Sequence, residues 1–223
     1  LREDVFRRLA IPAEFAKPLL VGELLRNYEP DLSSFTLWPY CGKDAAPKLH
    51  PRVKEDLTPF RSFLEVRSQF RKTQLEAGLD WFEFREYHRR ALRSQLTYAD
   101  ISTHVHVVLS DDVRVFNQHA PVIELPYRAS ANDHHSVAGA LNSSTALFWL
   151  KQICFNKGAG EDEHRDRFEF AGGKIEQLPV PAPFAQALRG KPNVLAERLT
   201  ALSRGCWERG RELPSLALRK LFE

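Results

Sequence analysis

The hydrophobic pattern changes its period along the chain, and this change limits the fold class more than any other feature. Apolar residues recur at steps of three and four from Val53 to Leu64, which predicts a helix over residues 52–78 that Gly78 ends. From about Thr97 the pattern becomes β-branched runs instead, and helical spacing returns after residue 132. This order predicts an α+β fold with a helical N-terminal part, a small central, mostly antiparallel sheet with packed helices, and a helical C-terminal tail.

Short strands are expected in the middle of the chain. Val105–Leu109 and Val113–Phe116 flank a turn at residues 110–112, which predicts a hairpin. Val122–Leu125 lies between two prolines and predicts an edge strand. Residues 168–170 and 174–180, separated by a glycine pair, predict a strand, a turn and a strand.

Helices are expected on both sides of these strands. Residues 1–27 predict one or two short helices that Pro12 and Pro18 interrupt. Asn132 or Asp133 is expected to cap a helix that runs to about Leu141. The turn at residues 142–144 then caps a second helix, over residues 145–155, whose nearly uniform apolar composition predicts burial, with Phe148 in the core.

Composition excludes several classes of protein. Hydrophobic residues make up 43% and charged residues 27% of the 223 residues, as in globular domains rather than disordered chains. No apolar run approaches the ~20 residues of a membrane span. The three cysteines lie far apart and predict reduced thiols, which favours a cytoplasmic protein. The opening, Leu1-Arg2-Glu3-Asp4, predicts a fragment of a longer protein.

Familiar catalytic motifs are absent from the sequence. It has no glycine-rich phosphate loop, no GxSxG and no HExxH, so no catalytic residue is assigned. His104 and His106 are expected on one face of a strand, where two histidines can ligate a metal. Equally, the two imidazoles can form hydrogen bonds in a half-buried sheet, and no metal ligand is assigned.

A basic and aromatic segment extends from Arg61 to Arg93. Basic residues outnumber acidic ones there, and Trp81, Phe82 and Phe84 lie among them. Cations contact phosphates and aromatic rings stack on bases, so the segment suits nucleic acid. The alternative is a solvated amphipathic helix with salt-bridged faces, which the chain's net charge of +3 also permits.

Several strings of residues carry the interpretation further. Val115–Pro126, Leu141–Gln152 and Phe168–Pro181 together resemble the C-terminal half of large adenine-specific DNA methyltransferases. The resemblance is to the phage-growth-limitation type of the BREX and DISARM defence systems, and to type IIG restriction–modification enzymes with a TaqI-like specificity domain. Gly22–Tyr28 resembles the entry motif of that domain, and the resemblance runs in order from about residue 18 to 181.

The resemblance implies that residues 1–183 form a target-recognition (specificity) domain. Pro179, Pro181 and Pro183 mark its end, and residues 184–223 predict a helical C-terminal tail. The family's Asn/Asp-Pro-Pro-Tyr/Phe motif and its S-adenosylmethionine loop are absent from the sequence. The fragment is therefore expected to lack the catalytic domain and to bind no cofactor, with S-adenosylmethionine bound elsewhere in the parent chain.

The partners implied are double-stranded DNA and the missing N-terminal methyltransferase domain of the same chain. The expected DNA contacts are basic or polar residues of the basic segment, the central strands and the later helices: Arg61, Arg67, Lys72, Arg85, Arg89, Thr103, His104, Lys151, Lys157 and Lys174. Two other functions stay open. One is a module that docks other defence-system proteins, and the other is a metal-dependent hydrolase centred on His104 and His106.

Overall fold

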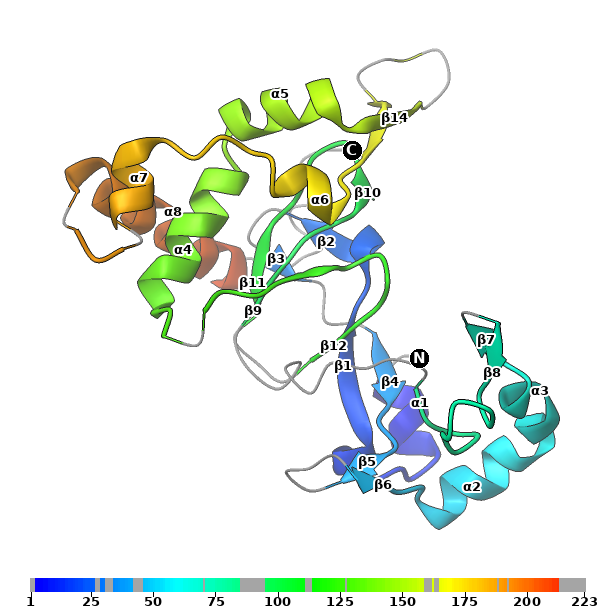
Figure 1. Cartoon of the computed structure of the whole chain (residues 1–223). Helices are drawn as coiled ribbons and strands as arrows, with labels where there is room; N and C mark the ends of the chain where they lie inside the picture. The colour runs from blue at the N-terminus through cyan, green and yellow to red at the C-terminus, as the bar shows by residue number, and fades with distance from the viewer. Residues whose placement is uncertain are drawn as a thin grey trace. The chain divides into compact units, whose positions relative to one another are not determined.

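The computed structural model describes residues 3–26, 29–30, 34–41, 46–69, 71–84, 95–110, 114–126, 128–158, 162, 165–187, 189–191 and 193–212. The chain forms two compact units (Figure 1). Unit 1 comprises Leu1–Leu19, Leu32–Leu92 and Val113–Val115, and unit 2 comprises Leu20–Asp31, Arg93–Asp112 and Phe116–Glu223.

Unit 1 combines a small sheet with short helices. Helix α1 is Glu3–Arg8, and the 3-10 turn η1, Ala13–Phe15, leads into strand β1, Ala16–Leu20. Strand β1 pairs antiparallel with β4, Phe35–Leu37, in a sheet of order β12-β1-β4, where β12 is Val115–Phe116. The N-terminal part is therefore helical only in part, since Pro18 lies within a strand opposite Phe35.

The rest of unit 1 packs around aromatic side chains. Two ladders are β5, Tyr40–Cys41, with β6, Ala46–Pro47, and β7, Ser68–Gln69, with β8, Lys72–Thr73. Buried Trp38 and Tyr40 pack with Phe84 and Val115. The Tyr40 hydroxyl accepts the backbone N–H of Phe84 at 2.8 Å. This contact ties the segment that follows Trp81 to the core of the unit.

The helix expected over residues 52–78 is shorter than predicted. Helix α2 is Pro51–Leu57, η3 is Thr58–Phe60 and α3 is Arg61–Glu65. Pro59 has no N–H to donate, and the helix tightens there into a 3-10 turn. Beyond Glu65 the chain turns back in the β7–β8 hairpin, where Arg71 has a φ of 64°. The apolar spacing itself ends at Leu64, next to the last residue of α3, so the predicted extension to Gly78 is wrong.

Unit 2 contains two three-stranded sheets and most of the helices. One sheet has the order β11-β9-β13, with β9 Gln95–Thr97, β11 Val108–Ser110 and β13 Val122–Ile123. The other has the order β10-β15-β14, with β10 Ile101–Ser102, β14 Phe155–Gly158 and β15 Arg167–Glu169. The described sheet pairs of the unit are antiparallel, as predicted, and β13 lies at an edge, also as predicted. A two-stranded ladder joins β2, Leu25–Arg26, to β3, Glu29–Pro30, after the turn η2, Gly22–Leu24.

The predicted hairpin between residues 105–109 and 113–116 is wrong. Strand β11 pairs with β9, and β12 lies beside β1. Val107, Val108 and Leu109 are all buried, so they need partners on more than one side. Burial against distant strands therefore outweighs the local turn signal.

Helices surround the core of unit 2. They are α4 Ala131–Leu141, α5 Ser144–Ile153, α6 Gly172–Ile175, α7 Ala182–Ala187 and α8 Val194–Glu212. The α+β class and the C-terminal helix are thus confirmed. The core includes Leu96, Val105, Leu150 and Phe170. The strand expected over residues 174–180 is wrong, because the chain turns helical at the glycine pair, with Glu176 N–H bonded to Gly172 C=O.

The capping predictions are confirmed for one helix and wrong for the other. Ser143 caps α5 by accepting the N–H of Ala146 at 3.2 Å, as the turn predicted. Ser130, rather than Asn132 or Asp133, caps α4, and Asp133 returns a bond to the Ser130 N–H as a capping box. Phe148 of α5 is 69% exposed, so its predicted burial is wrong. Ala146 and Leu150 occupy the buried face, and Phe148 projects from the other side of the helix.

Candidate nucleic-acid interface

One face of the β10-β15-β14 sheet presents an aromatic and charged surface. Glu169 of the central strand lies opposite Ile101 on one side and Phe155 on the other. Directly opposed residues of an antiparallel sheet share a face, so these three side chains line the same face. Phe168 lies on the other face and packs against the core of unit 2. The face with Phe155, which is 67% exposed, is therefore the outer one.

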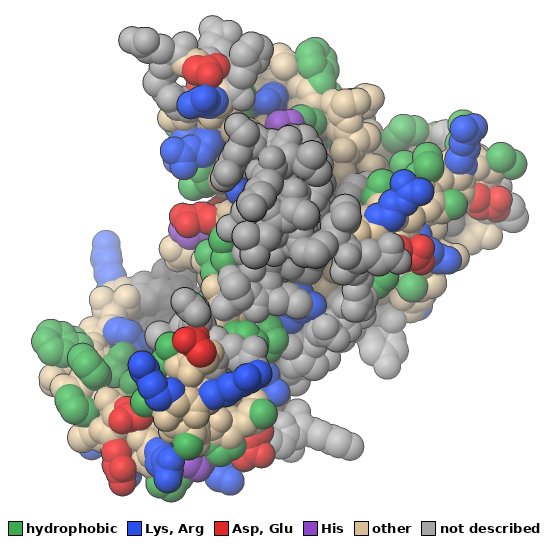
Figure 2. Space-filling view, turned by 180° about the vertical axis from the view of Figure 1, so that it is seen from behind, with side chains coloured by type: hydrophobic (Ala, Val, Ile, Leu, Met, Phe, Trp, Pro, Cys, Tyr) green, Lys and Arg blue, Asp and Glu red, His purple; other side chains and the backbone are tan. Residues whose placement is uncertain are grey.

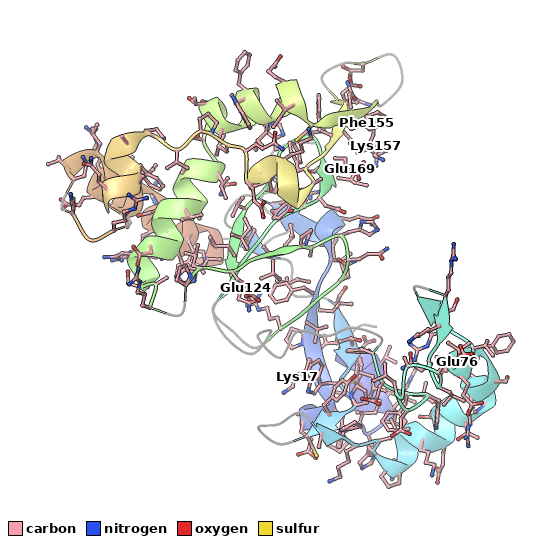
Figure 3. The ribbon with its side chains drawn as sticks, viewed as in Figure 1. Lys17, Glu76, Glu124, Phe155, Lys157 and Glu169 are labelled. Carbon is pink, nitrogen blue, oxygen red and sulfur yellow. The ribbon has the colours of Figure 1, made fainter. Side chains whose placement is uncertain are left out.

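A β-bulge places Lys157 on this outer face. The ladder pairs Asn156 with Phe168 and Gly158 with Arg167, which leaves Lys157 as the extra residue. Its Nζ lies 2.7 Å from Glu169 Oε2 and 5.2 Å from the centroid of the Phe155 ring. Figure 3 shows Phe155, Lys157 and Glu169 side by side at the end of β14. We call these three residues the outer-face triplet.

A second cation lies against the opposite side of the same sheet. Lys151, in the last turn of α5, has its Nζ 5.0 Å from the centroid of the Phe168 ring. Its charge also acts on His104, whose pKa is lowered first by burial and then by Lys151. Lys151 and His104 therefore belong to one neighbourhood of unit 2, although 47 residues separate them in the sequence.

The two histidines lie in a loop rather than on a strand. Strand β10 ends at Ser102, and the backbone of His106 has a φ of 47°, so the predicted strand placement is wrong. The rings nevertheless lie 5.6 Å apart. The side chain of Asn142 holds the loop at Val107, accepting its N–H at 2.8 Å and donating to its C=O at 2.7 Å.

Burial keeps His106 neutral at physiological pH. It lowers the pKa of His106 to about 4, with smaller contributions from the charges of Arg26 and His104. Thr103 Oγ1 lies 3.0 Å from His104 Nδ1, so the hydroxyl and the imidazole are hydrogen-bonded to each other. A neutral imidazole can donate or accept a hydrogen bond, but it adds no charge to hold a phosphate.

The two histidines have no further metal ligands grouped with them among the described residues. Within the described ranges, no three side chains of His, Cys, Asp or Glu are grouped so that they could hold an ion. Two histidines alone fall short of the four ligands of a structural zinc site or the three of a catalytic one.

The basic residues of unit 1 differ in their surroundings. Arg61 is exposed, with its Nε 2.5 Å from Glu65 Oε1 and its guanidinium 5.8 Å from the centroid of the Trp81 ring. Lys72 is exposed at the start of β8. On the side of unit 1 seen in Figure 2, basic, acidic and hydrophobic side chains are interspersed. Arg85 and Arg89 lie outside the described residues.

Arg67 has a structural set of partners. Its Nη2 donates to the carbonyl oxygens of Trp81 at 2.9 Å and Glu83 at 3.0 Å, and its Nε donates to that of Leu64 at 3.1 Å. Partial burial lowers its pKa. The guanidinium thus joins the end of α3 to the segment around Trp81.

Lys174, the last of the expected contacts, lies half-buried in α6. It is close enough to Cys154 for its charge to oppose the effect of burial, which raises the pKa of that thiol. The structure thus brings Thr103, His104 and Lys151 into one neighbourhood and places Lys157 on the outer face.

Sequence reasoning missed Phe155 and Glu169. The alternation at residues 168–170 already placed Glu169 on the face opposite the two phenylalanines, and that signal was available. Phe155 was assigned to the end of a helix, where an apolar residue gave no sign of exposure. The residue begins a strand instead, since Cys154 ends α5 with an extended conformation.

Comparisons with known proteins place this chain beside an adenine-specific methyltransferase. The relative is Adenine-specific methyltransferase PglX of Streptomyces coelicolor, to which the chain is 33% identical over 213 residues. The match covers 89% of this chain and 18% of the relative, so the chain spans less than a fifth of the relative's length. No protein-family model matches the chain.

Among the described residues, no helix is both long and apolar enough to cross a membrane.

Proposed function

We propose that this chain is the DNA target-recognition part of a longer adenine-specific DNA methyltransferase of the phage-defence type. The observation that carries the proposal is the similarity to PglX over 89% of the chain. The aromatic and cationic outer face of the β10-β15-β14 sheet supports it, because such surfaces suit contact with phosphates and bases.

The division of labour in such an enzyme fits the sequence. An amino-methyltransferase must take its adenine out of the stack into a catalytic pocket, while another part holds and reads the duplex. The chain has no Asn-Pro-Pro-Tyr motif, so methyl transfer and S-adenosylmethionine belong to another part of the parent protein. In this proposal residues 1–183 form the specificity domain, residues 184–223 form the tail, and the parent acts in the cytoplasm.

Double-stranded DNA is the proposed partner. The phosphate contacts are proposed among the exposed or half-exposed cations Arg61, Lys72, Lys151 and Lys174, with Arg85 and Arg89 from the same basic segment. Lys157, on the outer face, is a further proposed DNA contact. Thr103 and His104 are proposed to approach base edges as neutral hydrogen-bonding groups. Arg67 is proposed to act indirectly, by holding the segment around Trp81 in place at the DNA surface, since its guanidinium donates to the carbonyl oxygens of Trp81 and Glu83.

Salt-dependent DNA binding tests the proposal. The purified chain should bind duplex DNA with an affinity that falls as salt rises. Removal of each true phosphate contact should flatten the slope of log binding constant against log salt concentration by ~0.9. Lys72→Ala and Lys151→Ala are the test variants. Lys54→Ala is the matched control, since this exposed lysine of α2 lies outside the proposed contacts. Affinity that is absent, or that does not vary with salt, would contradict the proposal.

A further inference from the structure

The outer-face triplet holds a hydrogen-bond donor and an acceptor at a fixed spacing. Lys157 Nζ and Glu169 Oε2 lie 2.7 Å apart, and their side chains are 40% and 43% exposed. Both come from a sheet rather than a loop: Glu169 from the central strand and Lys157 from the bulge beside it. The ring of Phe155 lies under the ammonium and limits its movement.

Stability alone gives little reason for this arrangement. An exposed ion pair contributes little to stability, because water and salt screen its charges. The sheet is already held to the core by Phe168 and Phe170 on its other side. The pair is thus available to exchange its mutual bond for bonds to a ligand of complementary pattern.

A G·C base pair has that complementary pattern at its major-groove edge. Guanine presents two acceptors, N7 and O6, and cytosine presents the N4 donor. Guanine O6 and cytosine N4 are hydrogen-bonded to each other in the base pair. Their separation is therefore a hydrogen-bond length, like that between Lys157 Nζ and Glu169 Oε2. An ammonium can donate to N7 and O6 while the adjacent carboxylate accepts from N4. In an A·T pair the N6 donor separates N7 from O4, so the ammonium meets one acceptor instead of two.

We propose that Lys157 and Glu169 together read one G·C base pair of the DNA site from the major groove, with Phe155 holding the lysine in place. This inference rests on the proposed function, because it requires that the chain bind duplex DNA. It adds a residue, Glu169, that charge alone would exclude from a DNA surface, and it gives that residue a base to recognise.

Selection from a randomised duplex library tests the inference. The wild-type chain should enrich a site that has G·C at one position, and this preference should depend on Lys157 and Glu169. Glu169→Gln should relax or move that position toward A·T, because an amide pairs with adenine N6 and N7. The loss of preference should be roughly 5- to 150-fold, the range for one well-formed base contact. Lys157→Ala should relax the same position.

Asp162→Asn is the matched control. It also removes one carboxylate from an exposed ion pair, that with Arg165 at 3.1 Å, but it lies outside the triplet. It should leave the selected site unchanged. Thermal melts of all variants should match the wild type, since the substituted side chains are exposed.

The outcomes separate the two proposals. A wild-type chain that binds no DNA, or binds all sequences equally, contradicts the proposed function. A clear site preference that neither Glu169→Gln nor Lys157→Ala alters would leave the proposed function in place. It would overturn only the inference that Lys157 and Glu169 read a base pair. Changes at two different positions for the two variants also overturn it, because the residues would then act separately.

Discussion

His106 combines a left-handed backbone with an imidazole that is mostly shielded from water. Its φ of 47° is uncommon for a residue with a Cβ, and His and Asn tolerate it better than most. Burial, with the charges of Arg26 and His104, lowers its pKa from 6.5 to about 4. The folded protein therefore binds this proton less readily than the unfolded chain does.

This difference predicts a loss of stability in mild acid. As the pH falls from about 6.5 to about 4, the unfolded imidazole takes up a proton that the folded one refuses, so the free energy of unfolding falls. His106→Asn keeps a side chain that suits the left-handed backbone and removes the titration. Denaturant melts from pH 7 to pH 4 should show a smaller loss in the variant. Parallel losses in the two proteins would show that His106 does not contribute.

The sequence shows where the basic residues lie, but it does not show which of them support the fold and which are free to contact a ligand. Arg61 and Arg67 belong to the same predicted helical pattern. Arg67 bonds to Trp81 and Glu83, which lie 14 and 16 residues further on, because the chain turns back after Glu65. No local spacing carries that information, since it depends on where a later loop is placed.

At the scale of elements, α5 shows how a buried face is chosen. The helix has apolar residues on nearly all sides, and composition alone gave no preferred side. The residues at helical spacing, Ala146 and Leu150, face the core, while Phe148 lies about half a turn away from Leu150 and is exposed. The cap at Ser143 could be predicted because capping is local, whereas the choice of face depends on the strands below.

The two sides of α5 should respond differently to truncation. Leu150→Ala removes a fully buried side chain and should lower the free energy of unfolding by about 2–5 kcal/mol. Phe148→Ala removes an exposed one and should stay within about 0.5 kcal/mol of the wild type. Urea melts of both variants measure this. A larger cost for Phe148→Ala than for Leu150→Ala would mean that the helix is turned the other way.

Strand pairing was the least predictable feature of the fold. The β-branched runs correctly indicated strands at residues 108–110 and 115–116, but their partners are β9 and β1. Thr97 of β9 shows why, since its hydroxyl donates to the carbonyls of Ala120 and Pro121, more than 20 residues away. Pairing reflects such long-range contacts, and a turn signal constrains only its neighbours.

At the scale of the whole molecule, the C-terminal helix α8 is part of the packing of unit 2. Gly139 of α4 lets it approach closely, because a Cβ there would lie 3.0 Å from Ser203 Cβ. The Trp207 indole N–H donates to Leu109 C=O at 3.1 Å, and its ring lies 5.4 Å from that of His135. Ser136 and Thr200 are joined by a hydrogen bond between their hydroxyls.

Removal of residues 184–223 should therefore destabilise the rest of the chain. The truncated protein would expose the face of α4 that carries Ala138 and Gly139, together with the end of β11. We expect its thermal unfolding to shift to lower temperature and to lose cooperativity. Trp207→Phe in the complete chain is the milder companion, since it removes the donor to Leu109 but keeps an aromatic ring. A truncated chain that melts like the complete one would show that the tail does not stabilise the rest of the chain.

Segments of the two units alternate along the sequence, and this order limits which recombinations between related genes preserve the packing of each unit. Most of unit 1, Leu32–Leu92, lies between two stretches of unit 2 in the sequence. A single genetic crossover within this region would join part of a unit from one parent to part of the same unit from another, and would mix residues that must pack together. Two crossovers, near residues 32 and 92, would transfer that block but would separate β4 from its partner strand β1, because most of β1 lies in Leu1–Leu19. Chimaeras between relatives should therefore take Leu1–Leu19 and Leu32–Leu92 from the same parent.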